Sequence, residues 1–347
     1  MEYKTATLIA LICSAGLLAA CSSGGGSDDE TPLACAAAGI TECINNDDCC
    51  PSGCDNSLDN DCPAGSGQPA PEFPGDGLLV DHSAAQAFDD IPDCWLDRAK
   101  AITFHYAHTS HGGQIVAGLN YLELYVDEKY SSAVRQSTDE GLPDAETPPA
   151  LRIYDGNPPN TYITPDLYWD GNNGMNMTRA VADTGNYDYS MWSWCGQQSD
   201  NSADDVNRYL ATINTFESEY PNMRFILMTG HTDGSQDSNP DSVLRRNNDM
   251  VRDYASDHEM ILLDFADLEK YDPDGNYYQD VNDACDSPQG SWCDNWCSAN
   301  PTQCPNALAN LSCEHSKGPI CYQKARAFWW MMARLAGWNG EAGQACN

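Results

Sequence analysis

The sequence has few basic residues. It contains 17 Lys and Arg against 52 Asp and Glu, a formal net charge of −35, and no Lys or Arg between Lys4 and Arg98. A surface this acidic repels phosphate backbones, which excludes nucleic acid as a partner. Beyond the N-terminal segment there is also no apolar run of about 18 residues, the length that a transmembrane helix requires. Hydrophobic residues make up 41% of the chain, enough for an ordinary buried core.

The N-terminus has the pattern of an export signal. Lys4 precedes an apolar run over residues 5–20, which is too short to span a bilayer comfortably, so residues 1–20 are predicted to be a signal peptide. The ending Leu-Ala-Ala-Cys21 resembles the bacterial lipobox, which implies an acylated Cys21 and a lipid bilayer as partner. We expect an exported lipoprotein of the outer membrane or cell surface. A plain secretory signal that ends near a cysteine is the alternative.

Seventeen cysteines exceed what a reducing cytosol permits without metal, so an oxidising compartment is expected. Residues 21–34 are rich in Gly, Ser and acids and are predicted to be a flexible tether. Residues 35–62 hold six cysteines and are predicted to form a small disulfide-rich module with three bridges. Residues 63–77 have the composition of a second linker, and residues 78–347 form the main domain.

The main domain has nine cysteines. Six of them fall within residues 285–321 and are predicted to make local bridges around the loop of His315. Cys94 and Cys346 flank the domain, so a bridge between them would tie its ends together. This leaves Cys195 unpaired, either as a buried thiol or as a reactive one, and a cysteine nucleophile with a nearby histidine is a minor alternative.

Apolar runs and helical patterns alternate in the main domain. Residues 101–106, 151–155, 224–229 and 260–265 are nearly continuously apolar, as expected for buried parallel strands. Helices are predicted over residues 113–125, 202–220, 242–258 and 322–338. The pattern predicts an α/β fold with three layers (α/β/α) and a mainly parallel sheet, in which ligands bind at the carboxyl ends of the strands.

Histidines gather at those strand ends. Four of the seven lie there: His108 and His111 follow the first predicted strand, His231 follows the third, and His315 precedes the last helix. The order of these motifs resembles the SGNH (GDSL-like) hydrolase superfamily over residues 98–338. The matching positions are Ser110, Gly156, Gly230 to Asp233, and His315. The sequence departs from the family pattern at Ser312, where the family has an acid.

The resemblance implies a fold of the SGNH or flavodoxin-like kind and a serine ester hydrolase that needs no cofactor. Ser110 would be the nucleophile and His315 its base, because a serine hydroxyl is a weak nucleophile without a base in hydrogen-bond reach. Glu314 or Asp233 would orient the imidazole.

The oxyanion would be stabilised by backbone amides at Ser110, at a helix N-terminus, and at Gly156. Thr232 occupies the position of the family's amide donor, so His111 or His231 is expected to donate in its place. Asn157, next to Gly156, is expected to contact substrate.

Residues 156–201 are predicted to be a long loop rich in Asn, Gly and aromatic residues, including Trp192 and Trp194. Aromatic faces and amides suit sugar rings, which favours an ester on a carbohydrate as substrate. Packing of the same aromatics against the domain is the other possibility. A non-catalytic glycan-binding lipoprotein with a decayed hydrolase site is therefore an alternative function.

Metal binding is the third alternative. His108, His111, His231 and His315 have side chains suited to zinc, which would make this a His-rich metal-binding protein. His105 is expected instead to be buried and hydrogen-bonded. Asp272, Asp274 and Asn276 alternate as in a calcium loop, but the twelfth position is Asp283 and not the usual Glu, so a surface turn is favoured over structural calcium.

Overall fold

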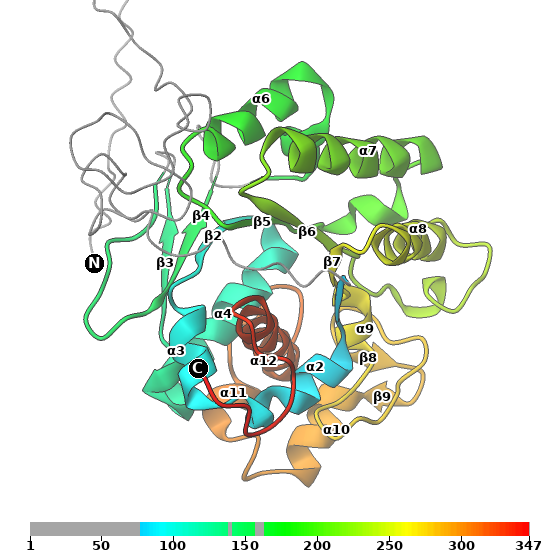
Figure 1. Ribbon diagram of the computed structural model, residues 1–347. Helices are drawn as coiled ribbons and strands as arrows, with labels where there is room; N and C mark the ends of the chain where they lie inside the picture. Colours follow the sequence, from blue (N-terminus) through cyan, green and yellow to red (C-terminus); the bar gives the residue numbers. More distant parts are fainter. Residues whose placement is uncertain (1–76, 138–140, 157–162, 347) are drawn as a thin grey trace, which may run out of the picture. The chain divides into compact units, whose positions relative to one another are not determined.

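The computed structural model describes residues 77–137, 141–156 and 163–346 (Figure 1). The predicted signal peptide, tether and cysteine-rich module lie outside the described residues, as do the predicted linker up to residue 76, Cys21 and Asn157. Every described residue belongs to a single compact unit.

The main domain is built on a seven-stranded sheet in the order β1-β7-β6-β5-β2-β4-β3, with every neighbouring pair parallel. The prediction of an α/β fold with a parallel sheet is confirmed. The strands are β1 Leu78–Val80, β2 Thr103–Ala107, β3 Ser132–Gln136, β4 Leu151–Asp155, β5 Tyr189–Trp192, β6 Arg224–Met228 and β7 Ile261–Leu263.

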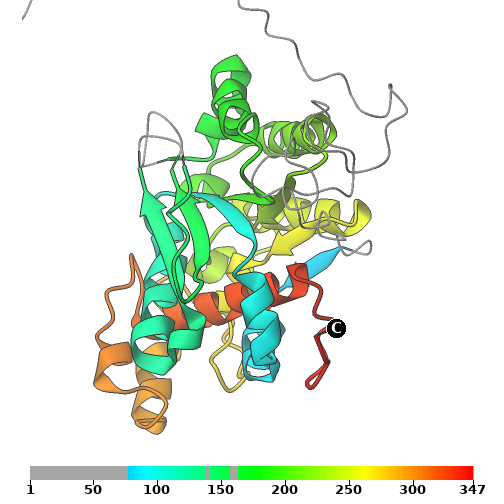
Figure 2. The same cartoon turned by 60° about the vertical axis from the view of Figure 1, so that its left-hand side comes forward.

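Helices cover both faces of this sheet (Figures 1 and 2). Helices α12, α4, α2 and α3 pack together on one face, and α6, α7 and α8 lie on the other. The bounds are α2 His82–Gln86, α3 Asp93–Ala99, α4 Gly113–Tyr121, α5 Asp166–Trp169, α6 Gly171–Ala182, α7 Ala203–Glu219, α8 Val243–Asp257, α9 Phe265–Glu269, α10 Trp292–Ala299, α11 Asn306–Ala309 and α12 Gly318–Leu335.

The helix starts and contacts follow from particular residues. Ser202 and Asp205 form a reciprocal capping box at the start of α7. Helix α12 is buried along almost its whole length. Gly118 lets α4 approach it closely, since a Cβ at that position would lie 2.0 Å from the carbonyl oxygen of Cys321. Of the described helices, none is both long and apolar enough to cross a membrane.

The chain reverses its direction of travel across the sheet between β2 and β5. From β2 it builds β3 and β4 on one side, and it then returns to place β5 on the other side of β2. Ala107 of β2 and Trp192 of β5 are register partners at the carboxyl ends of these strands. In open α/β sheets such a reversal leaves a crevice outside the strand ends, which is where ligands bind.

The prediction of a long aromatic loop over residues 156–201 is wrong, because this segment contains α5, α6 and β5. Trp192 is 2% exposed and Trp194 is 1% exposed. Trp192 stacks on Tyr168 and packs edge-on against Phe225. These aromatic faces are core contacts, so they offer no surface to a sugar ring.

The predicted disulfides of the main domain are confirmed. Cys94 bonds to Cys346, which joins the two ends of the domain. Among the described cysteines only Cys195 is free. The local bridges are Cys285–Cys293, Cys297–Cys304 and Cys313–Cys321.

Candidate active site

Three side chains form a hydrogen-bonded chain at the carboxyl edge of the sheet. The Sγ atom of Cys195 lies 3.1 Å from Nδ1 of His111, and Nε2 of the same ring lies 2.9 Å from Oδ2 of Asp283. His111 is buried, whereas Cys195 and Asp283 are partly exposed. A nucleophile, a base in contact with it, and a third group that orients the base are the components of a catalytic triad.

The reversal between β2 and β5 brings Cys195 to His111. Cys195 follows β5 by three residues, and the backbone continues the ladder through the Ser193 amide, which donates to the Ala107 carbonyl at 2.9 Å. Gly112 makes this approach possible. A Cβ on Gly112 would lie 2.2 Å from the Cβ of His108 and 2.7 Å from Oγ of Ser193, so a larger residue would push the two strand ends apart.

Asp283 comes from a segment that pairs with the loop after β6. The Gly234 amide donates to the Val281 carbonyl at 3.1 Å, and Asp233 forms an antiparallel bridge with Asn282. This pairing places Asp283 beside the strand-end loops. The acid of the triad therefore reaches His111 from a segment that follows β7 and α9.

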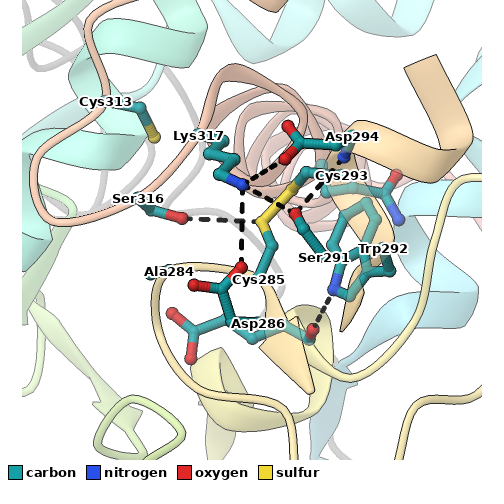
Figure 3. Close-up of a disulfide and its surroundings, with 12 residues drawn as sticks. Ala284, Cys285, Asp286, Ser291, Trp292, Cys293, Asp294, Cys313, Ser316 and Lys317 are labelled. Atoms are coloured by element: carbon teal, nitrogen blue, oxygen red, sulfur yellow. Dashed lines mark hydrogen bonds and ion pairs between the residues drawn. A yellow bond between two sulfur atoms is a disulfide. The ribbon is translucent and has the colours of Figure 1, made fainter. Parts of the chain in front are cut away.

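A disulfide joins the Asp283 segment to α10, and one lysine joins both of them to the loop before α12 (Figure 3). Cys285 and Cys293 form the disulfide. The Nζ atom of Lys317 lies 2.6 Å from Oδ2 of Asp294 and 3.6 Å from Oδ1 of Asp286, so the ammonium joins both sides of the bridge. This cross-linking stabilises the loops that carry Asp283 and His315.

The electrostatics favour a thiolate–imidazolium pair. The hydrogen bond from His111, with a smaller contribution from the Ser110 hydroxyl, outweighs burial and lowers the pKa of Cys195 to about 5. Burial lowers the pKa of His111, but its hydrogen bonds to Asp283 and Cys195 raise it more, to about 9. Burial raises the pKa of Asp283, but the hydrogen bond from His111 outweighs burial and lowers the pKa overall, so the carboxylate stays ionised. At neutral pH both ring nitrogens of His111 are therefore donors.

Two more imidazoles cover the faces of the His111 ring. His231 stacks on it at 4.1 Å between centroids with an angle of 7°, and His315 stacks at 4.5 Å with an angle of 16°. His231 donates from Nδ1 to the Thr232 carbonyl at 2.7 Å, which fixes its tautomer when it is neutral. The three-histidine stack thus shields the central imidazole from solvent.

The same residues contain the donor atoms of a metal site, since ring nitrogens of His111 and His231 and an oxygen of Asp283 lie within 4.8 Å of one another. However, a histidine binds metal in the plane of its ring. The planes of His111 and His231 are nearly parallel and stacked, so their lone pairs do not converge on one point. One ring would have to rotate before both could bind the same ion.

The structure does not join Ser110 to His315. The Ser110 hydroxyl lies 3.3 Å from Sγ of Cys195, and His315 is exposed and contacts the site through its stacking on His111. His315 also has a positive φ of 60°, which is uncommon for a residue other than glycine. In the described part of the chain no hydrogen bond links an imidazole to Glu314 or Asp233, and both of these residues are exposed.

The residues predicted to bind the oxyanion or substrate mostly face inward. The Gly156 amide donates to the Tyr106 carbonyl at 3.1 Å, so its hydrogen is already used in the sheet. Thr232 donates from its amide and its hydroxyl to Oε2 of Glu269, at 2.6 and 2.8 Å. Neither group is free to bind a substrate in this structure. His111 and His231 do lie in the site, but in the stack described above.

The remaining histidines of the first motif are structural. His105 is fully buried, where its Nε2 donates to the Gly156 carbonyl at 2.8 Å and its Nδ1 accepts from Ser190, as expected. Burial lowers its pKa to about 4, so it is neutral. His108 donates from Nε2 to Asp155 at 2.9 Å and from Nδ1 to Thr109. Burial opposes protonation of His108, but these acceptors outweigh it and raise the pKa.

The calcium-type loop is closed by its own donors. Asp272 accepts from the amides of Asp274 and Asn276 and from the hydroxyl of Tyr278. The Asp274 carboxylate accepts from Trp296. The arrangement is that of a hydrogen-bonded turn, in which the Asp272 oxygens already have partners.

Neither a family model, nor a curated protein sequence, nor a solved structure matches this chain. Sequence reasoning found His111, His231 and His315 but assigned the nucleophile to Ser110, and it treated Asp283 only as a position in a calcium loop. The one signal for Cys195 was that it had no disulfide partner.

Proposed function

We propose that this protein is a cysteine-dependent acyl hydrolase. Cys195 is the nucleophile, His111 its proton-transfer partner and Asp283 the carboxylate that orients His111. The observation that carries the proposal is the chain Cys195–His111–Asp283 at the point where the sheet reverses direction. The reaction class is the ester hydrolysis expected from the sequence, with a different nucleophile.

In the first half-reaction the Cys195 thiolate attacks the acyl carbon of an ester. A carbon–sulfur bond forms and the bond to the leaving oxygen breaks, while the His111 imidazolium gives its Nδ1 proton to that oxygen. The products are an alcohol and a thioester on Cys195. Because the thiolate is already formed at neutral pH, this step needs no prior deprotonation.

In the second half-reaction water hydrolyses the thioester. Neutral His111 removes a proton from the water, the new carbon–oxygen bond forms, and the carbon–sulfur bond breaks. The thiolate and the imidazolium are restored, and the acid leaves. Asp283 remains ionised throughout and stabilises the imidazolium through the bond to Nε2.

Ser110 supports this mechanism as a hydrogen-bond donor to the thiolate. A serine esterase of the SGNH kind is the second candidate, because the Ser110 hydroxyl lies in the same site, 3.3 Å from Sγ of Cys195. The order β4-β2-β5-β6-β7 agrees with the flavodoxin-like arrangement, which supports that resemblance in topology. Export, acylation of Cys21 and attachment to the outer membrane or cell surface remain part of the proposal.

Labelling of the full chain tests the nucleophile. Iodoacetamide and a fluorophosphonate are applied separately to the wild type, to Cys195→Ala and to Ser110→Ala, and the modified residue is identified by peptide mass spectrometry. We expect iodoacetamide to modify Cys195 and hydrolysis of p-nitrophenyl acetate to fall at least a hundredfold in Cys195→Ala.

The result that contradicts the proposal is a fluorophosphonate adduct on Ser110 together with full hydrolysis by Cys195→Ala. That outcome would favour the serine esterase. If all three proteins fail to hydrolyse the ester and Cys195 reacts no faster than free cysteine, the cysteine hydrolase and the serine esterase are both wrong. That outcome would favour the non-catalytic glycan-binding alternative.

A further inference from the structure

A lysine and a glutamate form an ion pair beneath the three-histidine stack. The Nζ atom of Lys324, on α12, lies 2.5 Å from Oε1 of Glu269 at the end of α9, and both side chains are 0% exposed. The ammonium also lies 3.2 Å from the ring centroid of Phe265. The chain has only 17 basic residues, and one of them, Lys324, is fully buried.

One branch of this pair leads to His231. The Glu269 carboxylate accepts from the Thr232 amide at 2.6 Å and from its hydroxyl at 2.8 Å. Thr232 is the next residue after His231, and its carbonyl in turn accepts from Nδ1 of that histidine. Glu269 therefore holds Thr232, and with it the loop after β6, through two hydrogen bonds to one carboxylate oxygen.

The other branch leads to His111 and His315. The Lys324 ammonium donates to Oε1 of Gln114, and the Gln114 amide nitrogen donates to the Glu314 carbonyl. Gln114 lies three residues after His111, and Glu314 immediately precedes His315. The ion pair is thus connected by hydrogen bonds to His231 through Thr232, and to the residue before His315 through Gln114, which lies three residues after His111.

The burial of this pair is costly, because two charges leave water, and removal of one partner leaves the other charge without compensation. Apolar side chains of similar volume would fill the same space at less cost. The hydrogen bonds of the pair, by contrast, satisfy the Thr232 donors in the loop after β6 and the Gln114 acceptor in the first turn of α4. This distribution of contacts points to a role in geometry more than in overall stability.

We infer that Lys324 and Glu269 are positioning residues, which hold His231, His111 and His315 in register so that His111 stays between Cys195 and Asp283. The inference rests on the proposed function, since it concerns the same Cys195 site. Neither residue contacts Cys195, so both act through the loops they anchor.

The test compares Lys324→Met with Arg326→Met in the full chain. Arg326 lies on the same helix, is nearly as buried and pairs with Asp89, an exposed residue unconnected to the stack, which makes it a matched loss of one charge. For each protein the rate of Cys195 alkylation by iodoacetamide is measured between pH 4 and pH 9, with the thermal midpoint measured in parallel.

For Lys324→Met we expect the alkylation rate at pH 6 to fall at least tenfold and its pH midpoint to move upward, because displaced loops weaken the thiolate–imidazolium pair. For Arg326→Met we expect the rate and the midpoint to stay within twofold and a few tenths of a pH unit of the wild type. Equal profiles for both variants and the wild type would overturn the inference.

The double variant K324M/E269Q keeps the test decisive if Lys324→Met does not fold. A neutral amide at position 269 still accepts from Thr232 and leaves no unpaired charge in the core. We expect the double variant to fold and to show a rate at least tenfold below the wild type, because the Lys324 donor to Gln114 is lost. A folded double variant with the rate of the wild type would contradict the positioning role. Alkylation requires no substrate, so this outcome is independent of whether p-nitrophenyl acetate is hydrolysed.

Discussion

Ala107 and Trp192 lie opposite each other at the carboxyl ends of β2 and β5. His111 follows Ala107 by four residues and Cys195 follows Trp192 by three, so the register of these two strands determines where the imidazole meets the thiol. The two strand ends approach so closely that there is no space for a side chain at Gly112. The site is therefore a consequence of strand pairing, and it depends on two loops that leave the sheet at adjacent positions.

The Cys195 mechanism uses His111 as the base and the Ser110 mechanism uses His315, so substitution of each histidine distinguishes the two mechanisms. We expect His111→Ala to lower ester hydrolysis at least a hundredfold, because it removes the group that contacts both Cys195 and Asp283. His315→Ala should cost less than tenfold, since that exposed ring only stacks on His111. Steady-state kinetics of both variants check this. A larger loss for His315→Ala would favour the Ser110–His315 mechanism.

Ser110→Ala removes a hydrogen bond to the thiolate but leaves the triad intact. A hydrogen bond to a charged group contributes about 1.5–3 kcal/mol, so we expect a fall of about tenfold in the alkylation rate at pH 5 and a smaller change at pH 7. The measurement is alkylation of Cys195 at the two pH values. Complete loss of ester hydrolysis with unchanged alkylation would instead identify Ser110 as the nucleophile.

His105 makes folding sensitive to acid. Burial lowers its pKa from 6.5 to about 4, so between these values the unfolded chain binds a proton that the folded chain does not. The free energy of unfolding should therefore fall by about 3 kcal/mol from this group as the pH drops from 6.5 to 4. Urea unfolding of the wild type and His105→Gln at pH 7 and pH 4.5 checks this. An equal loss in both proteins would contradict it.

The Cys94–Cys346 bridge should stabilise the domain more than a short local bridge does. It spans 252 residues, for which the loop-entropy model gives about 5 kcal/mol, against about 2 kcal/mol for the 7-residue span of Cys297–Cys304. We expect C94A/C346A to lower the free energy of unfolding more than C297A/C304A. Urea unfolding under non-reducing conditions measures both. Equal losses would show that chain entropy is not the main contribution.

The strands that the sequence predicts correctly are those with nearly continuous apolar runs. Residues 101–106, 151–155, 224–229 and 260–265 correspond to β2, β4, β6 and β7. The edge strand β3 (Ser132–Gln136) is partly polar and exposed, so it lacks this signal. β5 is only four residues long and lies in a segment with the composition of a loop.

Failure to detect β5 explains why the sequence prediction placed the nucleophile at Ser110 and not at Cys195, the residue that we propose from the structure. Without β5, Cys195 is a loop residue, whereas with it Cys195 stands at a strand end like His111 and His231. Asp283 could not be inferred, because its approach depends on pairing between the segment at Val281 and the loop at Gly234. Contacts between remote loops follow from strand order and register, which local patterns do not specify.

The ionisation of Cys195 tests the central claim most directly. Thiolate absorbance at 240 nm is recorded as a function of pH for the wild type, with Cys195→Ser subtracted. The structure predicts a thiolate that forms as the pH rises through about 5, and an acylation rate that then falls as His111 loses its proton near pH 9. A midpoint near 8.5, the value of an ordinary thiol, would contradict the Cys195–His111–Asp283 account.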